Sequence, residues 1–183
     1  MVKLADIDSK TFARSITDRV LHFHSWGLLT AIGPAAEPSP RIEGLGNVGL
    51  AALVLCHYAQ TGEEPGDAPI AEYLQSYCEA LYTRAGDAGS YDVPPLDQAR
   101  GEPQHEHELV LLAAVGRDLL SAGSPVSLLQ LAAISDTPYQ SVRRLAASGE
   151  IAREPRSPVP AEEARRWLAS RGVAGFREEV TAG

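Results

Sequence analysis

Apolar residues in the first two thirds of the chain recur at helical spacing. Within residues 9–29 they follow one another at intervals of three or four, which predicts a helix with one buried face. They include Phe12, Ile16, Val20 and Phe23. Residues 45–58 are almost continuously apolar, so we expect a buried central helix there. The Gly-Pro step at 33–34 separates the two.

Two further helices are predicted before residue 123. Asp67 is placed to cap one that continues through Ile70 and Tyr77 and ends near Gly86. Residues 86–103 are rich in Gly, Pro and Asp and predict a loop, and residues 104–120 predict the next helix.

The segment Ala122-Gly123-Ser124-Pro125 then interrupts the helical pattern, and we place a domain boundary there. Residues 1–123 are expected to form a helical dimerisation or partner-binding domain. Residues 124–176 are expected to form a second domain, followed by a tail at 177–183.

The second domain carries the most specific local pattern. Ser127 opens a capping box with Gln130, which predicts a helix start. Ten residues later Thr137 repeats the pattern with Gln140, and Pro138 takes the first helical position that proline favours. Two short helices with a tight turn between them are therefore expected, a helix-turn-helix.

The second of these helices, residues 138–148, has two contrasting faces. Val142, Leu145 and Ala146 share the apolar face, while the opposite face displays Gln140, Ser141, Arg143 and Arg144. Arginine can pair with guanine and glutamine with adenine, whereas serine hydroxyls suit phosphates. Arg153 and Arg156 lie in a proline-bounded loop that fits a short wing on the neighbouring DNA backbone or minor groove. A third helix is expected at residues 160–171 and should pack against the first two.

The pattern LLQLAAISDTPYQSVRRLAASGEI, with VPAEEARRWLASRG after it, resembles the MerR-like and excisionase-like winged helix-turn-helix domains. The resemblance covers roughly residues 126–173. It implies binding of double-stranded DNA by residues 138–148, with Tyr139, Gln140, Arg143 and Arg144 at the matching positions. We also expect contacts from Ser127 and Thr137 at the helix starts and from Ser141, Arg153 and Arg156.

Charge is distributed unevenly along the chain. The formal net charge is -8, but residues 1–123 hold 8 Lys/Arg against 17 Asp/Glu, while residues 124–183 hold 8 against 7. A local basic strip can attract phosphates on an acidic protein, because charges more than about 10 Å away are largely screened at 0.1 M salt. The charge pattern therefore leaves DNA binding by the second domain open.

No catalytic motif stands out, so we expect neither enzymatic activity nor a cofactor. Gly44-Leu45-Gly46-Asn47-Val48-Gly49 matches G-x-G-x-x-G, but no strand precedes it, so we interpret it as a helix entry. The histidines and cysteines lack the spacing of a structural zinc site, and we predict no metal. The N-terminus has no signal-peptide pattern and no apolar run reaches about 18 residues, which favours a cytoplasmic protein without a membrane segment.

Together these patterns predict a mainly α protein with an N-terminal helical domain and a C-terminal winged helix-turn-helix. We expect a transcriptional regulator that binds DNA as a homodimer, with residues 1–123 at the interface. Two alternatives stay open. The helix-turn-helix could contact protein in an adaptor, or the N-terminal domain could sense a ligand or metal.

Overall fold

A computed structural model describes residues 3–32, 46–64, 68–82 and 105–176. It is mainly α, as predicted. In the described residues the helices are η1 (Leu4–Asp6), α1 (Ser9–Ile32), α2 (Gly46–Thr61), α3 (Ile70–Tyr82), α4 (Glu106–Ser121), α5 (Leu128–Ile134), α6 (Tyr139–Ala147) and α7 (Ala161–Ser170). The same residues contain no strand, only an isolated antiparallel bridge between Val126 and Val159.

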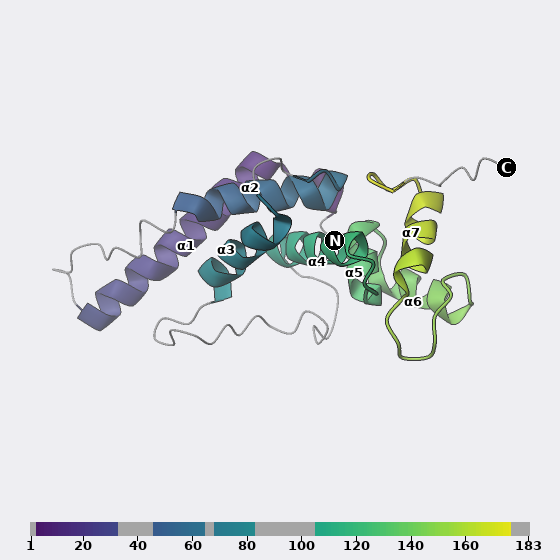
Figure 1. The fold of residues 1–183 in the computed structure, drawn as a ribbon. Helices are drawn as coiled ribbons and strands as arrows, with labels where there is room; N and C mark the ends of the chain where they lie inside the picture. Colours follow the sequence, from purple (N-terminus) through teal and green to yellow (C-terminus); the bar gives the residue numbers. More distant parts are fainter. Residues whose placement is uncertain (1–2, 33–45, 65–67, 83–104, 177–183) are drawn as a thin grey trace.

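Helix α2 packs against α1, α3 and α4, which confirms the predicted central helix. It runs alongside α1 in Figure 1. Its buried side chains include Val48, Leu55 and Cys56. Gly49 permits the close approach of α1, since a Cβ atom there would lie 2.7 Å from the Thr17 Oγ1 atom. The glycine motif at 44–49 thus leads into a helix, as expected, although residues 44 and 45 lie outside the described part.

The other two predicted helices of this half also form. Helix α3 is described as far as Tyr82, while Asp67, the expected end near Gly86 and the expected loop at 86–103 lie outside the described residues. Helix α4 begins with Glu106 and Glu108 in its first turn, where negative charge is favourable. The Glu108 carboxylate accepts a hydrogen bond from the His105 backbone N–H at 3.3 Å.

Helix α4 is shared by the two halves of the chain. It packs against α2 and α3 on one side and against α5 and α7 on the other. Gly116 brings α5 close, because a Cβ atom there would lie 2.9 Å from Ile134 Cδ1 and 3.0 Å from Gln130 Cβ. The buried apolar residues form one continuous core across both halves. The division into residues 1–123 and 124–176 stays a prediction, and the tail at 177–183 lies outside the described residues.

Across the described ranges, every helix is too short or too polar to cross a lipid bilayer.

Candidate nucleic-acid interface

Helix α5 begins with the predicted capping box. The Ser127 hydroxyl accepts a hydrogen bond from the Gln130 backbone N–H at 3.2 Å, and the Gln130 side chain accepts from the Ser127 N–H at 2.8 Å. All seven residues of α5 are buried. Helix α5 is therefore part of the core, and the Ser127 hydroxyl already accepts a hydrogen bond within the fold.

The start of α6 differs from the prediction. Thr137 does not cap this helix; its hydroxyl donates to the Ser135 carbonyl at 3.1 Å, within the turn. Pro138 is the residue before the first helical position, and its carbonyl accepts from the Val142 N–H at 3.1 Å. The expected second capping box is thus absent, because α6 begins at Tyr139 and Pro138, rather than Thr137, takes the N-cap position.

Helix α6 presents a polar face to solvent. Val142 is fully buried, whereas Gln140, Arg143 and Arg144 are exposed and recur at the spacing of one helix face. The Arg143 guanidinium lies over the Tyr139 ring, 5.8 Å from its centroid. Arg144 donates to the Ser141 hydroxyl at 3.3 Å. The two exposed arginines point outward from a helix whose other face is anchored in the core.

Gly149 terminates α6 as predicted. It adopts a φ of +83°, which suits glycine, and its N–H donates to the Ala146 carbonyl. The following N–H, of Glu150, donates to the Leu145 carbonyl at 3.0 Å. This Schellman motif fixes the direction in which the chain leaves α6.

The expected wing is a compact loop without a strand pair. Ile151 and Val159 are buried and anchor its two ends, with Val159 bridged to Val126. Arg153 is half-buried and donates to the Ser157 carbonyl at 2.9 Å, so it closes the loop. Arg156 is exposed at the loop tip with a φ of +65°. Of the two predicted phosphate contacts, Arg156 is the freer side chain.

Helix α7 supports this loop. Ala164, Trp167 and Leu168 are buried, but the main helix neighbour of α7 is α4 rather than the α5–α6 pair against which it was expected to pack. The Glu163 carboxylate accepts from the Ala152 N–H at 2.9 Å and so links α7 to the start of the loop.

The turn between α5 and α6 holds the N-terminal segment, which the sequence pattern did not predict. Asp136 has a φ of +50°, and its carboxylate accepts from the backbone N–H groups of Leu4 at 2.5 Å and Ala5 at 2.9 Å. The Gln60 side chain donates to the carbonyls of Leu4 and Ile7 at 2.9 and 2.8 Å. Helix α2, η1 and the turn are therefore linked by polar contacts.

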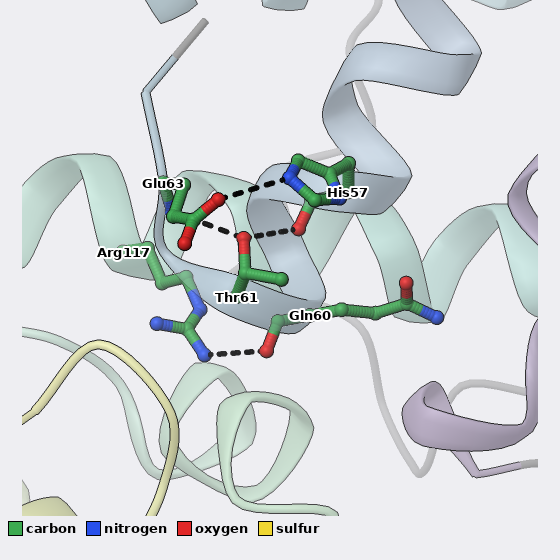
Figure 2. A network of polar contacts seen from close by, with 5 residues as sticks. All are labelled: His57, Gln60, Thr61, Glu63 and Arg117. Carbon is green, nitrogen blue, oxygen red and sulfur yellow. Dashed lines mark hydrogen bonds and ion pairs between the residues drawn. The ribbon is translucent and has the colours of Figure 1, made fainter.

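Arg117 is a second residue that sequence patterns missed. It is 4% exposed and donates to the carbonyls of Ala59, Gln60 and Ala174 (Figure 2 shows the Gln60 bond). Its partners lie 57 or 58 residues away along the chain. Spacing on one helix cannot reveal such a contact.

Among the described side chains, the histidines and cysteines do not converge. Cys56 is buried, and burial raises its pKa to about 11, while the neighbouring His57 is exposed and lies 3.4 Å from Glu63. His105 and His107 stack at the start of α4 with ring centroids 5.3 Å apart. Within the described residues no three potential ligands meet; the side chains of His22 and His24 lie outside them.

In comparisons with protein-family models, with curated proteins and with solved structures, nothing matches this chain.

Proposed function

We propose that this protein is a sequence-specific DNA-binding regulator that uses α6 as its recognition helix and acts as a homodimer. The observation that carries the proposal is the exposed face of α6, where Gln140, Arg143 and Arg144 stand together on a helix anchored by Val142. Arginine and glutamine are the side chains that read guanine and adenine in the major groove.

The surroundings of α6 support the same proposal. Helix α6 contains no acidic residue, and the exposed Arg156 lies in the loop that follows it. In the proposed complex, α6 contacts base edges, while Arg156 and backbone groups of the helix-turn-helix contact phosphates. Arg153 instead stabilises the loop through its hydrogen bond to the Ser157 carbonyl. The Tyr139 ring beside Arg143 limits the freedom of that guanidinium and so favours one orientation.

We infer a homodimer from the small size of the proposed DNA-binding unit. A single small DNA-binding module buries about 600–1,000 Å², which gives limited affinity and specificity. A homodimer would read two half-sites whose centres lie about 10 base pairs, or a multiple of this, apart.

Selection from a random-sequence duplex library, carried out with the whole chain, tests the function directly. We expect enrichment of one site with two related halves. At that site Arg143→Ala should weaken binding by about 1–3 kcal/mol and relax the base preference. Arg156→Ala should weaken binding to specific and random duplexes by a similar factor and lower the salt slope by about one.

Arg14→Ala is the matched control, because it removes the same charge from an exposed position on α1. It should leave binding to the selected duplex unchanged. Selection without enrichment, or wild-type binding by both Arg143→Ala and Arg144→Ala, would contradict the assignment. Those results would favour the adaptor hypothesis, in which the α6 face contacts protein.

A further inference from the structure

A cavity of about 230 Å³ lies where the end of α2 meets α4, α7 and the segment at residues 174–176. Two aromatic residues, Tyr58 and Phe176, and two arginines, Arg117 and Arg165, line it. The remaining lining residues are Gly62, Glu64, Ser121 and Gly175. The cavity thus combines cationic groups with apolar ring surface, and it is separate from the exposed face of α6.

Arg117 is the buried charge of this cavity. Its guanidinium donates to the Ala59 carbonyl at 2.8 Å, the Ala174 carbonyl at 2.9 Å and the Gln60 carbonyl at 3.3 Å. Figure 2 shows Arg117 beside the end of α2, directed at the Gln60 carbonyl. A guanidinium has five N–H donors, so two remain without an acceptor in the described part of the chain.

No carboxylate of the described residues neutralises this guanidinium. The two ion pairs found among those residues are His57–Glu63 and Arg166–Glu163, and Arg117 is in neither. Burial lowers the pKa of Arg117 to about 10, so it still carries its charge at neutral pH. Carbonyls at the C-terminal end of α2 favour this cation, but buried charges in proteins are almost always paired with an opposite charge as well. The chemistry that would complete this site is an anion.

The backbone is shaped to admit the guanidinium. Gly62 has a φ of +77° and Gly175 a φ of +83°. Cβ atoms at these two positions would lie 2.5 and 2.9 Å from the Arg117 Nη1 atom. Any larger residue would displace Arg117, so the two glycines form a cradle for one side chain.

Arg165 brings a second cation from α7. It is exposed, and its guanidinium donates to the Leu120 carbonyl at the end of α4. The Phe176 ring lies 5.1 Å from the Arg117 guanidinium carbon and forms part of the apolar wall. With Glu64 as the acidic lining residue, the cavity walls carry one net positive charge.

We propose that this cavity binds a small organic acid, with its carboxylate between Arg117 and Arg165 and its apolar part against Tyr58 and Phe176. Guanidinium groups pair with carboxylates through two parallel N–H donors. One net positive charge suits a monoanion better than phosphate, which would bring nearly two negative charges close to Glu64. The ligand must be small, since drug-sized molecules occupy about 300–1,000 Å³. This proposal does not depend on DNA binding.

Benzoate is the probe, because it joins one carboxylate to one ring. Titration calorimetry of the whole chain should show saturable binding of benzoate but not of benzamide, which has the same shape without the charge. In two-dimensional NMR spectra the amide signals of Gly62 and Gly175 should shift with benzoate. Arg165→Ala removes an exposed side chain and should weaken binding at least about tenfold while the fold is retained.

Arg166→Ala is the matched control, since Arg166 is the next residue on α7 and does not line the cavity. It should bind benzoate like the wild type. No saturable binding at millimolar benzoate, equal binding of benzamide, or unchanged affinity in Arg165→Ala would overturn the proposal. Inorganic phosphate that shifts the two glycine signals when benzoate does not would also overturn it. None of these results bears on DNA binding, which is measured without the acid.

Discussion

The link between Asp136 and the N-terminal segment can be tested by one substitution. The carboxylate accepts from the Leu4 N–H at 2.5 Å and the Ala5 N–H at 2.9 Å, and Leu4 itself is 3% exposed. Asp136 has a φ of +50°, a conformation that asparagine also tolerates. Asp136→Asn therefore removes the charge and one acceptor oxygen without adding backbone strain.

The expected magnitude follows from these two bonds. A hydrogen bond to a charged group contributes about 1.5–3 kcal/mol, and less where water can replace it. The bond to Ala5 is exposed, whereas the bond to Leu4 is partly buried. Since an asparagine side chain retains one acceptor oxygen, Asp136→Asn should lower the free energy of unfolding by about 1–2 kcal/mol. Asp136→Gly, which retains none, should lower it by about 2–3 kcal/mol.

Urea unfolding of the whole chain gives these free energies, and amide hydrogen exchange at Leu4 and Ala5 reports the contact directly. Both amides should exchange faster in the two variants. Glu150→Gln is the control, because it neutralises an exposed acid of the same region and should stay within about 0.5 kcal/mol of wild type. Wild-type stability and exchange in both Asp136 variants would refute the link.

Three other substitutions test local features. Ser127→Ala should lower the free energy of unfolding by about 0.5–2 kcal/mol in urea, since it removes the α5 cap. Gly175→Ala should lower the melting temperature more than Gly172→Ala: both glycines have positive φ, but only at Gly175 would a Cβ atom meet backbone, 2.7 Å from the Thr61 carbonyl oxygen. Hydrogen bonds with Thr11 lower the pKa of Asp8 below its usual value, so the ionised carboxylate stabilises the fold, and this stabilisation is lost as acid protonates it. The melting-temperature difference between wild type and Asp8→Ala should therefore shrink as the pH is lowered into the range where carboxyl groups become protonated, and a constant difference would contradict this.

Local patterns predicted helices well because their signals lie within a few residues. The apolar spacing of Phe12, Ile16 and Val20 predicted the buried face of α1, and all three are buried. Ser127 capped α5 as expected, yet the same pattern at Thr137 failed. The difference is where the helix starts: α6 begins at Tyr139, so Pro138 rather than Thr137 takes the N-cap position, and a four-residue motif does not encode that shift.

The unpredicted features depend on contacts between distant segments. The acceptor role of Asp136 needs backbone N–H groups 131 and 132 residues away along the chain. No sequence pattern marked Arg117 for burial, and its acceptors are carbonyls at the end of α2 and at Ala174. Sequence periodicity reports which face of a helix is apolar. It does not report which distant carbonyls will surround a polar side chain.

The packing of α4 bears on how the proposed DNA-binding unit should be defined. The interruption of the helical sequence pattern at 122–125 predicted a unit that starts at residue 124. However, α5 is buried along its whole length, and α4 is one of the helices that cover it. Gly116 of α4 approaches Ile134 and Gln130 closely, so the α4–α5 contact is as tight as a core contact. A fragment without α4 would expose that face of α5. The anchoring of Val142, and with it the orientation of the α6 arginines, would then lose its support. Experiments on DNA binding therefore need the whole chain, and α4 belongs structurally to both halves.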